Sequence, residues 1–321
     1  MSKIMPDWTK TPPTPVNIAV LLFDSFSNLC LANCLEPLRA ANTMTGRHAF
    51  DWRILTPDGA PVLSSSGMQV VPHAALPTLR DSDYLFITAS YDHERYDTAG
   101  SRHALRRASR NAAVSVGLDA GPWLMAAAGL LDGKRATVHW DLIDPFTERF
   151  PKVTAEQARV LRDGNRITCA GAMSALDLTL GLISTHLGEA ARLDVEALFI
   201  HGDPPVGRSA DCHAARDPLL RRALSAMREN VERPLSVNEL SSLLSCQPRT
   251  LNRRFQTGLG AAPGTVYRHL RLGVARKLLE GSQLGIAEVA LRCGYESPAA
   301  MTRAFRKVHG VAPSRLRKHP P

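Results

Sequence analysis

Short apolar runs alternate with amphipathic stretches over the first two thirds of the chain. Val16–Phe23 is an apolar run, and similar runs recur downstream between stretches in which apolar residues return every three or four positions. Apolar strands separated by helices are typical of a parallel sheet covered on both faces, so we predict an α/β domain. The predicted strands are Val16–Phe23, Trp52–Leu55, Tyr84–Thr88, Ala113–Leu118 and a hairpin of Val160–Arg162 with Arg166–Cys169; the predicted helices are Leu29–Ala41, Arg102–Arg110, Leu124–Leu130, Gly171–Leu187 and Ala190–Ile200.

The last third of the chain contains one pattern twice. Each copy has a short amphipathic helix, a tight polar turn and a second helix that ends in Arg-x-Phe. In the second helices, Leu251 and Phe255, and likewise Met301 and Phe305, lie four positions apart and would hold each helix to its own unit. The repeat predicts two helix-turn-helix units in an all-α domain, and therefore DNA binding.

A helix is predicted between the two units. It begins at Pro263 and ends at Gly281, and its apolar residues Val266, Leu270, Val274 and Leu278 recur every four positions. Such a helix would hold two recognition helices about one DNA turn, roughly 34 Å, apart. Arginine can bind guanine with two hydrogen bonds or neutralise phosphate. The outward positions that we expect to face DNA are Arg249, Thr250, Arg253 and Arg254 in the first unit, and Ala299, Ala300, Thr302, Arg303 and Arg306 in the second.

Basic residues are concentrated in this last third. Residues 216–321 carry 19 Lys and Arg against 7 Asp and Glu, whereas residues 1–215 carry 20 against 23. This segregation favours a phosphate-binding module joined to a domain that does not touch DNA. An ordinary solvated basic face is the alternative interpretation of the arginines.

Composition divides the chain into four segments. Residues 1–15 are rich in Pro and Thr and are predicted to be a disordered tail, and residues 16–200 form the first domain. Gly and Pro interrupt the periodicity over residues 201–216, the predicted linker, and residues 217–321 form the DNA-binding domain. No apolar run reaches the roughly 18 residues that span a membrane and no signal peptide is evident, so we expect a cytoplasmic chain. The six cysteines lack metal-ligand or disulfide spacing, and we expect neither a metal nor a cofactor.

The C-terminal pattern is specific enough to suggest a family. From about Asp217 to Lys318 the sequence resembles the DNA-binding domain of AraC/XylS-family transcription regulators, notably over Arg249–Phe255, Ile286–Ala290 and Gly294–Ser297. Because two of the base-reading positions that this resemblance implies are alanines, we expect the first unit to carry more of the sequence specificity. The implied positions are Arg249, Arg253, Ala299, Ala300 and Arg303.

The first domain also resembles a known group. The turn Gly117–Gly121, the pair His139-Trp140 and the segment Thr168–Gly171 resemble the DJ-1/PfpI superfamily. With the C-terminal domain, the whole chain resembles the GlxA subgroup of AraC-type regulators, nearest to those of choline, betaine, carnitine or arginine catabolism. The resemblance implies a flavodoxin-like parallel-sheet sandwich. Catalytic members of the superfamily carry cysteine at the turn, where this chain has Asp119, so we expect no enzyme activity.

Asp119 is the residue on which a ligand site is predicted. A residue between a strand and a helix lies at the carboxyl edge of the sheet, where open α/β folds bind ligands. Carboxylates and aromatic rings there would suit a small cation. The alternatives are that Asp119 caps the following helix, that the tryptophans fill the core and that His139 is a core histidine. The candidate ligand-binding residues are Glu36, Asp119, Ala120, Trp123, His139 and Trp140.

These features together predict a sequence-specific transcription regulator. We expect a ligand-responsive activator of a catabolic operon that senses a cationic or zwitterionic amine, such as a betaine, through a non-catalytic first domain. The expected partners are double-stranded DNA with paired half-sites, the small-molecule effector, a second copy of the chain in a homodimer, and RNA polymerase. Two alternatives stay open: a DJ-1/PfpI-type hydrolase or amidase with an appended DNA-binding domain, and a constitutive dimeric DNA-binding protein.

Overall fold

The computed structural model describes residues 7–199 and 217–316 and divides the chain into two compact units. The first, called the sheet unit, comprises Thr11–His186. The second, called the helical unit, contains residues 7–10, 187–199 and 217–316 of the described chain. The predicted linker at 201–216 and residues 1–6 of the predicted tail lie outside the described residues.

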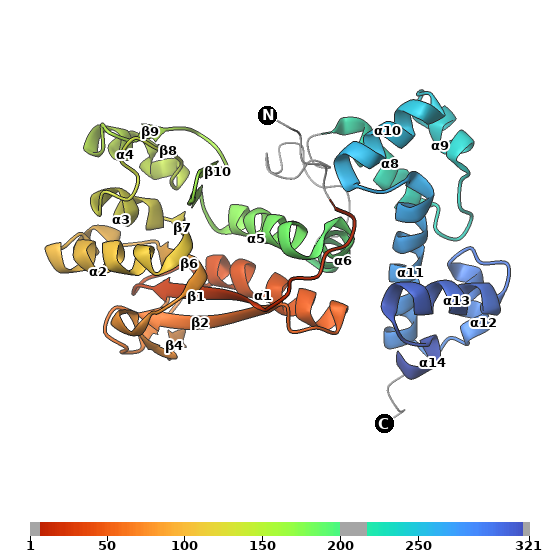
Figure 1. The fold of residues 1–321 in the computed structure, drawn as a ribbon, viewed down its shortest axis with the longest axis horizontal. Coiled ribbons are helices and arrows are strands. Elements are labelled where there is room, and N and C mark those ends of the chain that lie inside the picture. The colour runs from red at the N-terminus through yellow and green to blue at the C-terminus, as the bar shows by residue number, and fades with distance from the viewer. Residues whose placement is uncertain (1–6, 200–216, 317–321) are drawn as a thin grey trace. The chain divides into compact units, whose positions relative to one another are not determined.

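A seven-stranded sheet forms the centre of the sheet unit (Figure 1). Its strand order is β10-β11-β7-β6-β1-β2-β5, and all pairings are parallel except that of β10 with β11. That antiparallel pair is the predicted hairpin, in which Gly164 takes a left-handed conformation at φ 62°. The strands of this sheet are β1 (Val16–Leu22), β2 (Phe50–Thr56), β5 (Ala74–Ala75), β6 (Ser82–Ala89), β7 (Ala112–Asp119), β10 (Val160–Asp163) and β11 (Arg166–Cys169).

Two short strand pairs were not predicted. They are β3 (Val62–Leu63) with β4 (Gln69–Val70), and β8 (Arg135–Ala136) with β9 (Thr154–Ala155). Two-residue strands carry no detectable alternation of apolar and polar positions, which is why the sequence pattern did not indicate them.

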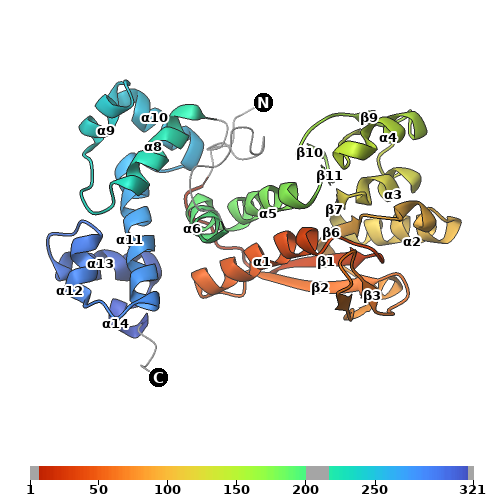
Figure 2. The ribbon, with the colours of Figure 1, turned by 180° about the vertical axis from the view of Figure 1, so that it is seen from behind.

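Helices cover both faces of the sheet, as predicted (Figures 1 and 2). Apolar residues of α2, α3 and α4 join one face in a single core that includes Leu85, Leu124 and Phe146. Helices α1 and α5 lie away from these three (Figures 1 and 2). The α-helices are α1 (Asn28–Thr45), α2 (Ala99–Arg110), α3 (Gly121–Ala127), α4 (Ile143–Arg149) and α5 (Ala172–Leu187), and the short 3-10 helices are η1 (Leu76–Thr78), η2 (His93–Tyr96) and η3 (Trp140–Leu142).

The helical unit contains both predicted helix-turn-helix units, α9 with α10 and α12 with α13. Each has its own hydrophobic core, the first around Leu251 and Phe255 and the second around Met301 and Phe305, and all four side chains are fully buried. The helices are α6 (Glu189–Phe199), α8 (Pro218–Glu229), α9 (Val237–Leu243), α10 (Pro248–Leu259), α11 (Pro263–Gly281), α12 (Ile286–Arg292), α13 (Pro298–His309) and α14 (Pro313–Leu316).

The linking helix α11 has the predicted bounds but not the predicted buried stripe in its second half. Val266 and Leu270 belong to the first core, whereas Leu272, Ala275 and Leu279 are the residues of α11 buried in the second. Val274 and Leu278 are only partly buried. A strict spacing of four drifts around a helix of 3.6 residues per turn, so the stripe leaves the buried face after two steps.

The sequence predicted that the first domain extends to residue 200, so that it would include helix α6. In the structure α6 belongs to the helical unit, and its Leu193 is fully buried in the core around Phe255. The sequence shows that a helix has an apolar face but not which core receives that face.

Residues 7–10 also differ from the predicted disordered tail. Trp8 packs against the same core. The backbone N–H groups of Glu189 and Ala190 donate hydrogen bonds to the carbonyls of Asp7 and Trp8 at 3.0 and 2.9 Å. A single tryptophan in a Pro- and Thr-rich segment finds its partner only in the tertiary structure.

Candidate functional site

Asp119 ends β7 in a strained backbone conformation. Its φ is 61°, a left-handed conformation that few residues other than Gly, Asn and Asp adopt. The turn also needs its flanking glycines: a Cβ at Gly121 would lie 2.0 Å from the carbonyl oxygen of Ile87, and one at Gly117 would lie 2.7 Å from Met125 Sδ. The two glycines therefore let α3 pack tightly against the sheet behind Asp119.

The Asp119 carboxylate is held by a neighbouring strand. Because β6 and β7 are parallel partners with Ala89 opposite Asp119, the next residue, Ser90, lies at the same sheet edge. Ser90 Oγ donates a hydrogen bond to Asp119 Oδ2 at 2.8 Å. Ser90 Oγ in turn accepts one from the backbone N–H of Ser27 at 3.0 Å. Sequence reasoning missed Ser90, although its place after a predicted strand was the available signal.

Burial raises the pKa of Asp119 above its ordinary value. The hydrogen bond from Ser90 and the nearby His139 lower it, and Asp141 raises it further. The hydrogen bond and the nearby charges therefore do not fully offset the cost of burying the charged form of Asp119.

His139 lies against Asp119 and the start of α5. Its backbone N–H donates to the Asp119 carbonyl at 3.1 Å, and its Nδ1 is hydrogen-bonded to Asp141. Gly171, at φ 145°, leaves room for the ring, because a Cβ there would lie 3.1 Å from His139 Cδ2. His139 is only partly buried, so the alternative of a core histidine does not describe it.

The two tryptophans of the predicted site have different environments. Trp123 is 5% exposed and packs among Phe146, Phe150 and His93, so the core interpretation describes it and its predicted contact with a ligand is not supported. Trp140 is 73% exposed and lies tilted beside His139, with ring centroids 5.6 Å apart.

A second exposed aromatic ring, that of Tyr91, follows Ser90 at the same strand end and was not predicted. Tyr91 is 68% exposed. His93, also missed, is buried with its Nδ1 3.1 Å from the Ser90 carbonyl oxygen. Neither residue shows a sequence signal of its own, because only the sheet register brings the end of β6 beside Asp119.

The capping alternative for Asp119 does not match the structure. The residue at the N-cap of α3 is Ala120, which is buried and makes no side-chain capping bond. The side chain of Asp119 points instead to Ser90. Asp119 thus keeps a carboxylate at the sheet edge that the local helix does not require.

Glu36 does not belong to this group of residues. On α1 the buried face carries Cys30, Cys34 and Leu38, whereas Glu36 is exposed and its carboxylate pairs with Arg39 at 2.8 Å. A residue six positions after Cys30 is turned about 240° around a helix, away from the sheet. The prediction that Glu36 supplies a second carboxylate to the site is therefore wrong.

The cysteines nearest to Asp119 are unreactive by environment. A hydrogen bond with Cys34 and burial hold the pKa of the Cys30 thiol well above its ordinary value, and burial also raises the pKa of Cys169 well above its ordinary value. The nucleophilic form of cysteine is the thiolate. These thiols therefore pack as neutral groups.

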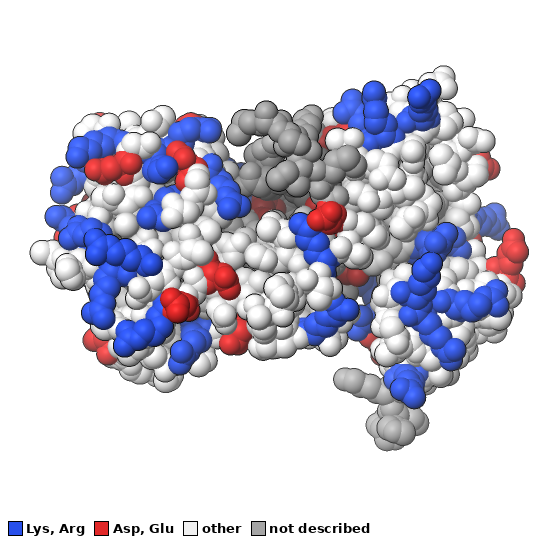
Figure 3. Space-filling model, in the orientation of Figure 1, with Lys and Arg blue, Asp and Glu red and all other residues white. Residues whose placement is uncertain are grey.

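The predicted DNA-facing side chains fall on the outer surface of α10 and α13. Arg249, Arg253, Ala299, Arg303 and Arg306 are exposed, while Thr250, Ala300 and Thr302 are partly so. Figure 3 shows Lys and Arg side chains gathered over the part of the helical unit where Figure 1 labels α13, and again near α10.

Arg254 is exposed like the other arginines of α10, but it has a partner within the protein. Its guanidinium lies 3.3 Å from the carboxylate of Asp217, which caps the start of α8. The side chain ties α10 to α8, and this ion pair competes with any contact to phosphate.

Neither a membrane helix nor a metal cluster is found in the described chain. No helix in residues 7–199 and 217–316 is long and apolar enough to cross a membrane. Over the same residues no three His, Cys, Asp or Glu side chains are grouped as metal ligands.

Comparison with known proteins assigns both parts of the chain. Residues 16–185 match the DJ-1/PfpI family and residues 240–319 match a helix-turn-helix domain. The HTH-type transcriptional regulator CdhR of Pseudomonas aeruginosa is 36% identical over 92% of this chain and 90% of its own. The HTH-type transcriptional regulator GlxA of Rhizobium meliloti is 34% identical over 94% of this chain and 95% of its own.

A solved structure supports the fold of the sheet unit. An AraC family transcriptional regulator from Pseudomonas putida superposes with a TM-score of 0.51 at 24% identity, covering 58% of this chain and 100% of that one. At this identity the likeness shows the fold alone, which is the flavodoxin-like arrangement predicted.

Proposed function

Because this chain belongs to the family of HTH-type transcriptional regulators that join a DJ-1/PfpI domain to an AraC-type helix-turn-helix domain, we propose that it regulates transcription in response to a small amine. The helical unit binds DNA, and the sheet unit senses a cationic or zwitterionic metabolite. The observation that carries the sensing role is the partly buried carboxylate of Asp119 at the turn between β7 and α3.

A cation is the ligand that this carboxylate favours. In the described part of the chain, no Lys or Arg lies within 4.0 Å of it, and its strong hydrogen bond is with the neutral hydroxyl of Ser90. A positive ligand would stabilise the charged form that burial penalises. The exposed rings of Trp140 and Tyr91 at this edge offer cation–π contact to an ammonium group.

A hydrolase function of the sheet unit is less favoured than sensing, although the DJ-1/PfpI family includes enzymes. The turn carries Asp119 in place of a cysteine, and burial keeps Cys30 and Cys169 as neutral thiols. We further propose that the protein is an activator that acts as a homodimer on paired half-sites, with each chain presenting α10 and α13 to neighbouring major-groove segments.

Replacing Asp119 by asparagine tests the sensing role. We expect calorimetry with choline, betaine, carnitine and arginine to find one ligand whose affinity falls at least about tenfold in Asp119→Asn, because the amide keeps the shape but not the charge. Glu36→Gln is the matched control, since it removes a carboxylate that lies on the exposed side of α1. Equal affinity in wild type and Asp119→Asn would exclude Asp119 from the site.

The raised pKa of Asp119 predicts the sign of the pH dependence. The cation binds the deprotonated carboxylate, so affinity should be highest above that pKa and fall as the pH drops through it. His93, His139 and Asp141 are the other titratable groups that act on this carboxylate. The amine affinity of Asp119→Asn is measured over the same pH range as that of the wild type. The difference between the two curves is the contribution of the Asp119 carboxylate to the pH dependence. An affinity that rises in acid would contradict a cationic ligand.

Footprinting on the DNA that flanks the gene tests the regulatory role as a whole. We expect protection of paired sites that sharpens or moves when one amine is added. A footprint indifferent to every amine would favour the constitutive DNA-binding alternative. Ligand turnover that depends on Asp119 would favour the enzyme alternative.

A further inference from the structure

Helix α6 is a structural part of the helical unit, although it precedes residues 200–216 in the chain. Leu193 is buried with the side chains of the first helix-turn-helix core. Arg192, 3% exposed, is paired within α6 with Glu189 at 2.6 Å and with Glu196 at 2.9 Å. A helix that buries both an apolar residue and a charged network is held specifically rather than laid loosely on a surface.

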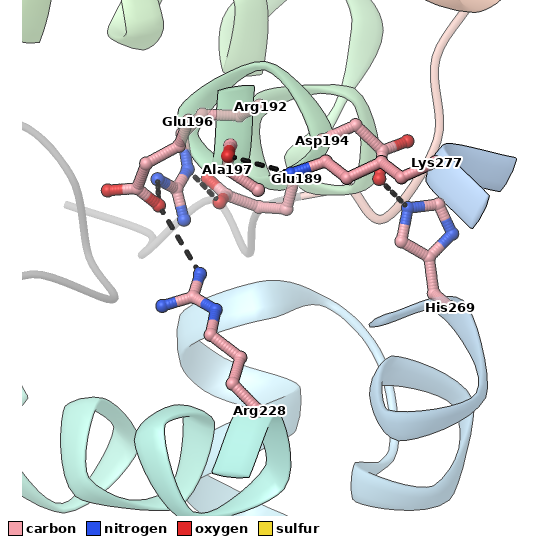
Figure 4. Close-up of polar contacts among 8 residues, drawn as sticks. All are labelled: Glu189, Arg192, Asp194, Glu196, Ala197, Arg228, His269 and Lys277. Carbon is pink, nitrogen blue, oxygen red and sulfur yellow. Dashed lines mark hydrogen bonds and ion pairs between the residues drawn. The ribbon is translucent and has the colours of Figure 1, made fainter. Parts of the chain in front are cut away.

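One stripe of α11 receives α6 (Figure 4). His269, Gly273 and Lys277 lie four positions apart, on one side of the helix. Asp194 Oδ1 lies 2.9 Å from His269 Nε2 and 3.6 Å from the position of a Cβ at Gly273.

The two ends of this stripe make further contacts, one a hydrogen bond and the other a ring contact. Lys277 Nζ donates a hydrogen bond to the Ala197 carbonyl at 3.0 Å. At the other end the Trp8 ring packs edge-on against His269, with centroids 5.3 Å apart. Arg228 of α8 lies 3.9 Å from Glu196, so α6 contacts two helices of the unit (Figure 4).

The stripe crosses the junction between the two helix-turn-helix cores. Val266, Tyr267 and Leu270 of α11 belong to the first core, and Leu272, Ala275 and Leu279 belong to the second. His269 and Lys277 lie on either side of this boundary. Because α11 is the helix that both cores share, a second helix docked across the junction restrains bending between the two recognition helices.

The chain leads from the candidate site to this contact through one helix. Gly171, against His139, immediately precedes α5, and α5 ends at Leu187. Gly188 alone separates α5 from α6 and takes a left-handed conformation at φ 90°. A Cβ at Gly188 would lie 2.7 Å from the Trp8 carbonyl oxygen, so this connection is closely packed.

We propose that α6 is a brace of the DNA-binding unit, that its docking on the His269, Gly273 and Lys277 stripe fixes the relative orientation of α10 and α13, and that effector binding acts on DNA affinity through this docking. The bracing stands on the contacts of α6 alone. The effector part rests on the proposed function of the sheet unit.

Two variants of the full-length chain test the brace. Gly273→Glu places a carboxylate against Asp194, and glutamate is a better helix former than glycine, so α11 itself is not weakened. Asp194→Ala removes the partner of His269. Glu280→Gln is the matched control, since it breaks the pair with Arg276 on the same helix, beyond Lys277 at the end of the stripe.

Amide hydrogen exchange, DNA affinity and amine affinity are measured on each variant. In Gly273→Glu and Asp194→Ala we expect exchange in α6 to accelerate at least about tenfold while β1, β6 and β7 keep their protection. DNA affinity should fall about tenfold and no longer respond to the amine, while the calorimetric affinity for the amine stays at the wild-type value. Glu280→Gln should behave as wild type.

Two outcomes would overturn the brace. Unchanged exchange of α6 in both variants would mean that the stripe does not hold it. If exchange in α6 becomes faster while the DNA affinity and its response to the amine stay at the wild-type values, α6 covers the core but does not brace the unit. If the DNA affinity of the wild type ignores every amine, the proposed function fails, while exchange and DNA affinity still decide whether α6 braces the unit.

Discussion

Replacing Phe305 by alanine should lower the free energy of unfolding of the second helix-turn-helix unit by about 3–5 kcal/mol, the usual loss when a buried phenylalanine is truncated. Phe305 is fully buried in the core that α11, α12 and α13 form around Met301. Denaturant unfolding followed by circular dichroism measures the change. The first helix-turn-helix unit has a separate core. Footprinting should therefore show that the DNA segment bound by the second unit loses its protection before the segment bound by the first.

Leu291→Ala is the matched control for Phe305→Ala. Leu291 lies in α12 of the same unit but is 61% exposed, so its truncation should change stability by no more than about 0.5 kcal/mol. Similar losses in both variants would show that the stability of the unit does not depend on the core around Met301 and Phe305.

Replacing Arg253 by alanine should cost about 1–3 kcal/mol of binding to the cognate site and relax selectivity at the base pair that it contacts. Arg253 is exposed on α10, between the buried residues Leu251 and Phe255 that orient this helix. Gel-shift titrations on the cognate site, on single-base variants and on scrambled DNA separate base recognition from phosphate contact.

Arg254→Ala is the control for this prediction, because its guanidinium is engaged by Asp217. We expect Arg254→Ala to leave base selectivity unchanged. If Arg253→Ala weakens cognate and scrambled DNA equally, Arg253 positions the protein on phosphate and does not read a base.

Much of the fold follows from local sequence patterns. The strands β1, β2, β6 and β7 and the bounds of α11 appear where apolar runs and Pro or Gly boundaries predicted them. The repeated spacing of Leu251 with Phe255 and Met301 with Phe305 predicted two cores, and the structure buries all four residues. Such patterns are local, and periodicity alone reveals them.

The candidate effector site was predicted only in part. Asp119 and His139 lie together, because the backbone N–H of His139, shortly after β8, donates a hydrogen bond to the carbonyl of Asp119 at the end of β7. Ser90 and Tyr91 follow a predicted strand but were missed, because the local sequence does not tell that this strand pairs with β7. Glu36 and Trp123 were chosen by residue type, and the helix face and the core packing determine that one is exposed and the other buried.

The sequence by itself determined the family, the two helix-turn-helix units and the replacement of the expected cysteine by Asp119, since each depends on residue identity at fixed spacing. Only the tertiary structure decided that Ser90 holds Asp119, that Arg254 is engaged by Asp217, and that Trp8 and α6 join the DNA-binding unit. These three facts depend on contacts between residues far apart in the chain. The sequence shows that an apolar face or a charged side chain needs a partner. Packing and the sheet register determine which residue that partner is.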